Sequence, residues 1–97
     1  MAVHFTGIKG TGMAALAGIL KDEGFDVKGS DIDKYIFTQD ELEKRGIPVS
    51  SFDPANIHAG DTVIAGLSFD EAHPEIQKAL ADPTVTVYWY NEYLGKL

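Results

Sequence analysis

One stretch near the start of the chain, HFTGIKGTGMAALAGIL at positions 4 to 20, constrains the fold more than any other part of the sequence. It passes from a short apolar segment, Val3 to Ile8, through a turn with three glycines into a segment where apolar residues recur at helical spacing from Met13 to Leu20. Such spacing forms one face of an amphipathic helix, and Gly24 suits the left-handed end of that helix. The stretch therefore predicts a strand, a glycine turn and a helix.

The rest of the chain continues this alternation. Four further apolar segments predict strands at 25–30, 47–52, 62–67 and 85–90. Between them, the run Thr38-Gln39-Asp40-Glu41 is typical of a capping box, with Phe37 and Leu42 as its hydrophobic staple, and predicts a helix that ends at Gly46. Pro74 opens another helix. Strands separated by helices form right-handed crossovers, so we expect an α/β fold: a Rossmann-like three-layer domain with a five-stranded parallel sheet.

Size and composition limit the possible functions. At 97 residues the chain has room for one core, so we expect residues 1–97 to form one domain. The net charge of −7 and the lack of a basic patch argue against a nucleic-acid partner. The longest apolar run, residues 13 to 20, is too short to span a membrane, so we expect no membrane partner. The absence of cysteine fits a cytoplasmic location.

The glycine turn is the strongest candidate for a ligand site. In doubly wound sheets, ligands bind beyond the carboxyl ends of the strands where the strand order reverses, and the first turn lies there. Gly7, Gly10 and Gly12 leave room for a close approach, and the following helix directs free backbone N–H groups and its positive dipole end at the turn. We interpret the turn as a diphosphate site. The alternative is that the glycines serve only a tight turn and close helix packing.

Asp31 is the second candidate, because it lies about twenty residues beyond Gly12 at the end of the second predicted strand. An acid at this distance accepts hydrogen bonds from ribose hydroxyls in dinucleotide-binding folds, and its alternative role is to cap the turn. The glycine spacing is G-x-x-G-x-G, whereas the usual nicotinamide fingerprint is G-x-G-x-x-G. This difference disfavours a nicotinamide-binding module of a reductase or regulatory protein, which stays open as an alternative, as does a ligand-free interaction scaffold.

Other chemically suggestive residues favour structural roles. His4, His58 and His73 do not have the spacing of zinc ligands, so we expect structural or solvated histidines and no metal site. No serine lies in a G-x-S-x-G motif, and no pair of carboxylates suggests acid–base catalysis. The segment YWYNEYL favours packing over a nucleic-acid platform. We therefore predict no catalytic residue in this chain.

Four segments together point to a known family. The stretch HFTGIKGTGMAALAGIL, followed by VKGSDI, FTQDELEKRGI and YNEYLGKL, closely resembles the amino-terminal domain of the Mur ligases over essentially all 97 residues. The resemblance implies that the domain holds the UDP part of UDP-N-acetylmuramate, while a central domain binds ATP and a third helps to position the amino acid. It also implies that the parent enzyme uses ATP and magnesium to convert the muramoyl carboxylate into an acyl phosphate, which the amine of L-alanine attacks to form an amide in peptidoglycan synthesis.

By position, the resemblance assigns three segments to substrate binding. The loop over the diphosphate would comprise Gly7, Ile8, Lys9, Gly10, Thr11, Gly12 and Met13. The uridine ribose would lie beside Ser30 and Asp31. The same crevice would be lined by Gly66, Leu67 and Ser68.

Two residues depart from the family pattern, and one motif is missing. Lys9 stands where many members have glycine; it could add a cation near the phosphates or point to water. His73 stands where members often carry asparagine as a helix cap. The 97 residues contain neither a G-x-x-x-x-G-K-[ST] loop nor the Gly-Lys-Thr signature of the family's ATPase domain. We therefore expect no cofactor in this domain, with ATP and magnesium bound elsewhere in the parent enzyme.

Overall fold

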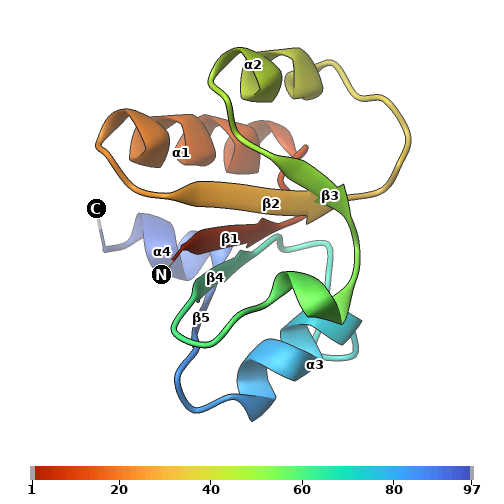
Figure 1. Cartoon of the computed structure of the whole chain (residues 1–97), viewed down its shortest axis with the longest axis vertical. Coiled ribbons are helices and arrows are strands. Elements are labelled where there is room, and N and C mark those ends of the chain that lie inside the picture. The colour runs from red at the N-terminus through yellow and green to blue at the C-terminus, as the bar shows by residue number, and fades with distance from the viewer. Residues whose placement is uncertain (1, 97) are drawn as a thin grey trace.

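Five short strands form one sheet in the computed structural model, which describes residues 2–96 (Figure 1). The strands are β1 (Val3–Thr6), β2 (Val27–Asp31), β3 (Val49–Ser51), β4 (Thr62–Ala65) and β5 (Thr86–Trp89). All four pairings are parallel, and the order across the sheet is β3-β2-β1-β4-β5. The predicted five-stranded parallel sheet is confirmed, although every strand is shorter than its apolar segment.

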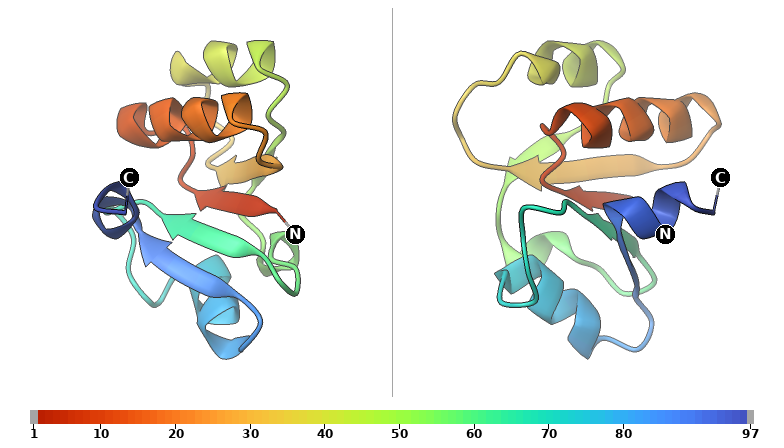
Figure 2. Two further views of the ribbon diagram at one scale, coloured as in Figure 1. Left: turned by 90° about the vertical axis from the view of Figure 1, so that its left-hand side faces the viewer. Right: turned by 180° about the vertical axis from the view of Figure 1, so that it is seen from behind.

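Helices cover both faces of the sheet (Figure 2). The helices are α1 (Thr11–Asp22), α2 (Thr38–Lys44), α3 (Pro74–Ala81) and α4 (Tyr90–Leu94), with a short 3-10 helix η1 (Pro54–Asn56). Apolar side chains of α1, α2 and α4 share one core, and those of α3 share a second, smaller core with the segment after η1. The domain therefore has three layers, as predicted. Within the described residues, no helix is long and apolar enough to cross a membrane.

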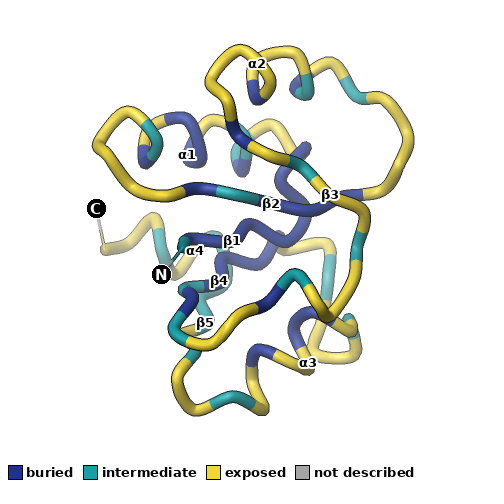
Figure 3. Tube along the Cα trace, viewed as in Figure 1, coloured by how far each residue is buried: buried dark blue, intermediate teal, exposed yellow. Residues whose placement is uncertain are grey.

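Alternation along β1 separates the two faces of the sheet. Val3 and Phe5 belong to the apolar core beneath α1. Their neighbours His4 and Thr6 point to the α3 side, where they hydrogen-bond to Glu75. All four residues of β1 are buried, as expected for the central strand of a parallel sheet (Figure 3). The first strand therefore has an apolar face and a polar face, both covered by helices.

The start of α2 differs from the prediction. Phe37 is the N-cap residue, and no side chain caps the helix. The hydroxyl of Thr38 instead donates to the carbonyl oxygen of Lys9 at 2.5 Å. The predicted capping box is therefore wrong, because a contact with the glycine turn uses the hydroxyl that would have capped the helix. The helix ends at Lys44, two residues before the expected Gly46, and Gly46 has a φ of +71°, a left-handed conformation common for glycine after a helix.

The order of the strands fixes where a ligand can bind. From β1 the chain moves outward to β2 and β3, and it then returns to the other side of β1 to form β4 and β5. The connections after β1 and β4 therefore run in opposite directions from the same edge of the sheet. Ligands of open α/β sheets bind at such a reversal. The glycine turn follows β1, so it lies at this point.

Candidate ligand site at the carboxyl edge of the sheet

The glycine turn is fixed to β2 by backbone hydrogen bonds. Gly7 N and Ile8 N both donate to the carbonyl oxygen of Ser30, at 2.9 and 3.1 Å. Gly7 has a φ of +89°, a conformation that side chains rarely allow, and Gly10 N donates back to Gly7 O at 3.2 Å. The turn is therefore closed by its own backbone hydrogen bonds.

Helix α1 begins from this turn without a cap. Its N-cap is Gly10, no side chain accepts from the first-turn N–H groups, and the first turn contains no acidic residue. The first N–H groups of a helix have no partners within the helix, and together with the macrodipole they attract an anion. The start of α1 is therefore suited to bind phosphate, and it lies beside the reversal of strand order.

The three glycines of the turn are not equivalent. A Cβ atom on Gly7 would lie 2.5 Å from the Phe69 ring, and one on Gly12 would lie 2.8 Å from Cζ of Tyr90. A Cβ on Gly10 would meet nothing closer than 3.5 Å, and the φ of Gly10 is an ordinary −61°. Packing within the chain therefore accounts for Gly7 and Gly12 but not for Gly10.

Asp31 links the end of β2 to the turn. Its Oδ2 accepts from the backbone N–H of Lys9 at 2.8 Å, and its Oδ1 accepts from that of Ile32 at 2.7 Å. The side chain is 8% exposed. The alternative role expected for Asp31, capping the turn, is thus present. Each carboxylate oxygen can accept a second hydrogen bond, so ribose contact remains compatible with this arrangement.

Lys9 does not point to water, which was one of the two roles expected for it. Its ammonium group donates to the carbonyl oxygens of Ile32 and Lys34, both at 3.0 Å, and the residue is only 4% exposed. The charge therefore points to these two carbonyl oxygens and not to water. It holds the connection between β2 and α2 against the turn.

The side chain of Ser30 points away from the turn, into a buried polar cluster on the α3 side. Glu75, which is fully buried, is the centre of this cluster. Its Oε1 accepts from Ser30 Oγ, Thr6 Oγ1 and His4 Nε2 at 2.7, 2.8 and 3.0 Å. Its Oε2 accepts from Asp53 N and Asn56 Nδ2, both at 3.0 Å.

The hydrogen bonds of this cluster keep Glu75 ionised. Burial raises the pKa of Glu75, but hydrogen bonds from His4, Ser30, Asn56 and the backbone of Asp53 outweigh burial and lower that pKa to about 2. His4 Nδ1 is buried without a partner among the described residues, which favours the tautomer that carries its proton on Nε2 and donates to Glu75.

Sequence reasoning missed this cluster. The signal available was a polar pair two positions apart, His4 and Thr6, in a strand expected to be buried. The role of Glu75 could not be seen, because it lies 71 residues from His4. The expectation of structural or solvated histidines agrees with the structure: His4 is buried in this cluster, His58 is exposed, and His73 Nδ1 caps α3 by accepting from Glu75 N at 3.1 Å.

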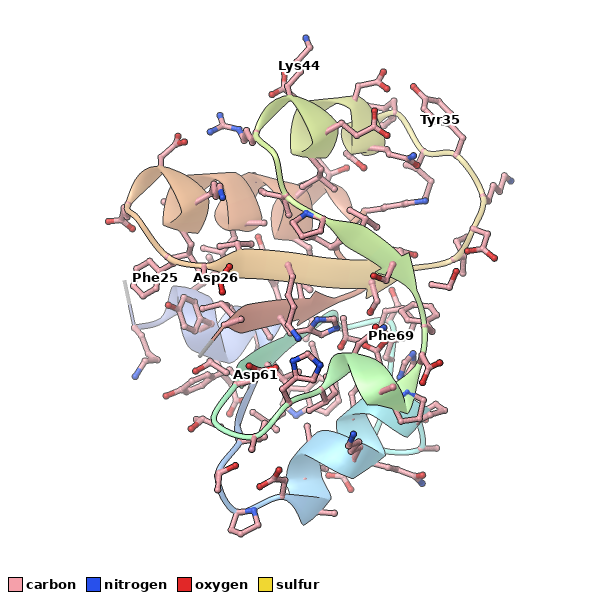
Figure 4. All side chains as sticks on the ribbon, in the orientation of Figure 1. Phe25, Asp26, Tyr35, Lys44, Asp61 and Phe69 are labelled. Atoms are coloured by element: carbon pink, nitrogen blue, oxygen red, sulfur yellow. The ribbon has the colours of Figure 1, made fainter. Side chains whose placement is uncertain are left out.

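The loop after β4 lies next to the glycine turn. Gly66 N donates to the carbonyl oxygen of Thr6 at 3.0 Å, which places the start of this loop beside the glycine turn. Leu67 is 61% exposed, and Ser68 is also exposed. Phe69 lies beyond the tip of β1 on the α3 side (Figure 4) and packs edge-on against the rings of Phe52 and His73.

Two surface hollows adjoin the glycine turn and the loop after β4. One, of about 620 Å³, is lined by Leu67, Phe69, Asp70, Glu71, Ala72 and Trp89. The other, of about 570 Å³, lies between the β2–α2 connection and β3 and includes Lys9, Ile32 and Ser51 in its lining. Within residues 2–96, no group of three or more histidines or carboxylates is placed to hold a metal ion.

Comparison with known proteins gives consistent matches over nearly the whole chain. The family model described as "Mur ligase family, catalytic domain" matches residues 2–97. Over 94 residues the chain is 61% identical to the UDP-N-acetylmuramate–L-alanine ligase of Levilactobacillus brevis and 54% identical to that of Pediococcus pentosaceus. Each match covers 97% of this chain and 21% of the relative, so the chain spans about a fifth of the length of these curated relatives.

Solved structures agree with these matches. The crystal structure of UDP-N-acetylmuramate-alanine ligase from Thermotoga maritima has a TM-score of 0.86 at 31% identity, over 99% of this chain and 22% of that one. A ligase from Neisseria meningitides that acts on UDP-N-acetylmuramate and L-alanyl-gamma-D-glutamyl-meso-diaminopimelate has a TM-score of 0.80 at 28% identity, over 98% of this chain and 30% of that one.

Proposed function

The chain belongs to the Mur ligase family, and from this premise we propose that it is the domain of a UDP-N-acetylmuramate–L-alanine ligase that binds the UDP part of the substrate. The names of its relatives supply the substrate and the reaction. The uncapped start of α1, directly after a glycine turn at the reversal of strand order, is the observation that carries the proposal.

In this proposal the diphosphate lies over residues 7–13. The free N–H groups at the start of α1 bind its oxygens, and the helix dipole contributes favourable electrostatics. Gly10 leaves room for the phosphates to approach, since its missing Cβ would meet only ordinary contacts within the described residues, the nearest at 3.5 Å. Thr11 is exposed at the first position of the helix, and Met13, which is buried, anchors that turn to the core.

The ribose lies at the end of β2 in the same proposal. Asp31 accepts from a ribose hydroxyl with the lone pairs that its backbone bonds leave free. Ser30 contributes through its carbonyl oxygen, which holds Gly7 and Ile8 in place, and not through its buried hydroxyl. Gly66, Leu67 and Ser68 line the opposite side.

The chemical steps belong to other parts of the parent enzyme. The 97 residues have no Gly-Lys-Thr loop to hold a triphosphate, and the described residues offer no cluster for magnesium. We place ATP and magnesium, which would activate the muramoyl carboxylate for attack by L-alanine, in the remaining domains. Since ATP is the energy source, we place the reaction of this peptidoglycan-synthesising enzyme in the cytoplasm.

Titration of the chain with UDP, UDP-N-acetylmuramate, uridine and NAD, followed by amide NMR shifts, tests the proposal. UDP should shift residues 7–13 and 30–31, and uridine should shift only the second group because it has no phosphate. NAD should bind less well than UDP, since its adenine is larger than a pyrimidine. Saturation by NAD at a lower concentration than UDP, with shifts in both regions, would replace the proposed function with a nicotinamide-binding module.

A further inference from the structure

Tyr90 brings an unassigned hydroxyl to the start of α1. It is the first residue of α4 and follows β5 directly, so it lies at the same edge of the sheet as the glycine turn. Its ring packs against the core shared by α1, α2 and α4. The far end of the ring reaches Gly12: a Cβ there would lie 2.8 Å from Cζ of Tyr90 and closer still to the hydroxyl oxygen. The hydroxyl therefore lies beside the first turn of α1.

The hydroxyl of Tyr90 forms no hydrogen bond within residues 2–96. Among the described residues, none forms a hydrogen bond with it, in contrast to the hydroxyl of Tyr35, which donates to Asp40 at 2.8 Å. Tyr90 is half-buried, and its oxygen is not among the buried polar atoms that lack a partner. The oxygen is therefore accessible to solvent. It lies beside the first turn of α1, whose backbone N–H groups have no side-chain cap either.

The charges of the chain favour a neutral hydrogen-bond donor for binding a phosphate at the start of α1. The chain carries a net charge of −7, and the ammonium group of Lys9 is turned into the β2–α2 connection. The first turn of α1 has no acidic residue that would repel an anion. A phosphate at this position must therefore be held largely by N–H and O–H donors, and a phenol O–H binds an anion with a short, strong hydrogen bond.

We propose that the hydroxyl of Tyr90 is a further binding group of this site and donates a hydrogen bond to a phosphate oxygen of the bound nucleoside diphosphate. The inference rests on the proposed function, because it takes the start of α1 as the phosphate position. It also gives Gly12 a second reason to be glycine: the missing side chain lets the phenol reach the helix start.

Replacement of the hydroxyl alone tests this role. Tyr90→Phe keeps the ring against Gly12, so the unfolding midpoint should stay unchanged. Its affinity for UDP, measured by calorimetry or NMR titration, should fall about tenfold to a hundredfold, as expected for loss of a hydrogen bond to a charged group. Its affinity for uridine, which has no phosphate, should not change. Tyr93→Phe is the matched control, because Tyr93 lies on the same helix but packs edge-on against Tyr88, and it should bind UDP as the wild type does.

The outcomes separate this inference from the function on which it rests. Equal UDP affinity of Tyr90→Phe and the wild type would overturn the role of the hydroxyl and leave the proposed function intact. A matching loss of UDP and uridine affinity would also overturn it, because the residue would then act through the shape of the whole site. Failure of the wild type to bind UDP would contradict the proposed function itself.

Discussion

At the scale of single residues, Gly10 is the glycine of the turn that packing within the protein does not explain. Phe69 and Tyr90 occupy the space beside Gly7 and Gly12, whereas a Cβ atom on Gly10 would make only ordinary van der Waals contacts, and its backbone conformation is ordinary. A ligand that comes close to the backbone would account for a glycine at this position. Gly10 therefore allows ligand binding to be tested without disturbing the fold.

We expect the substitution Gly10→Ala to leave the stability of the chain unchanged and to weaken its binding of UDP. The new methyl group meets nothing closer than 3.5 Å, so the free energy of unfolding should change by less than about 0.5 kcal/mol. UDP affinity should fall at least about tenfold if the phosphates approach over this residue. Thermal unfolding and a UDP titration measure the two effects. Gly12→Ala should instead destabilise the chain, because its Cβ collides with Tyr90.

Single residues also show where sequence reasoning succeeds and where it stops. The position of Asp31 near the end of a strand was predictable, because the apolar pattern places the second strand, although β2 ends one residue beyond the expected segment 25–30. The direction of the Lys9 side chain was not predictable. Its partners are the carbonyl oxygens of Ile32 and Lys34, and backbone carbonyls have no signature in a sequence. The five partners of Glu75 could not be predicted for another reason: they come from segments that lie far apart along the chain.

At the scale of elements, α2 is attached to the glycine turn through its first residue. The hydroxyl of Thr38 donates to Lys9 O, and the residue is buried. A helix that follows β2 thereby supports the loop that follows β1. The position of α2 is therefore coupled to the geometry of the candidate phosphate site.

Thr38→Val should weaken both the fold and the site. The change keeps the shape of the side chain but leaves a buried carbonyl oxygen without its donor, which costs about 1–2 kcal/mol. UDP affinity should also fall, because the turn loses one of its supports. Urea unfolding and a UDP titration provide the readouts. Thr86→Val, at an exposed position of β5, is the control; if it has the same effects, the Thr38 hydroxyl does not support the turn.

The elements themselves were largely predictable, and their ends were not. Alternating apolar segments and helix signals are local, and they gave the five strands, their order of appearance and the helices between them. Helix η1 was missed because its three residues form no repeating apolar pattern. The start of α2 was assigned wrongly because Thr38 fits a local capping pattern, while the folded chain offers its hydroxyl a distant acceptor.

At the scale of the whole molecule, Glu75 joins elements from both halves of the chain. From the first turn of α3 it accepts hydrogen bonds from β1, β2 and the segment around η1. Its pKa is lowered from 4.5 to about 2, because these bonds outweigh the effect of burial. A carboxylate with a depressed pKa stabilises the folded state above its unfolded pKa, and the effect is lost as the pH falls towards the folded pKa.

The chain should therefore lose stability between about pH 5 and pH 2, and Glu75 alone should account for about 3 kcal/mol of the loss. Urea unfolding at several pH values measures this dependence. Glu75→Gln should be less stable than the wild type at pH 7 by about 2–4 kcal/mol. The NH₂ group of the glutamine amide is a hydrogen-bond donor, and the groups that surround this side chain are donors too. Its stability should also vary less over the acid range. Exposed Glu71→Gln should behave as the wild type, and an unchanged acid profile in Glu75→Gln would contradict the assignment.

The polar face of β1 has a further consequence for how the chain reaches its folded state. The central strand pairs with β2 after about twenty residues of chain, but its other neighbour, β4, and its partner Glu75 come some sixty to seventy residues later. Such distant contacts form slowly, and a half-formed sheet with an uncovered apolar face is prone to aggregate. Until α3 docks, the uncovered side of β1 and β2 presents imidazole, hydroxyl and ammonium groups of His4, Thr6, Lys28 and Ser30. Water can solvate these groups, so without α3 this side of the two strands exposes polar groups to solvent and not an apolar surface.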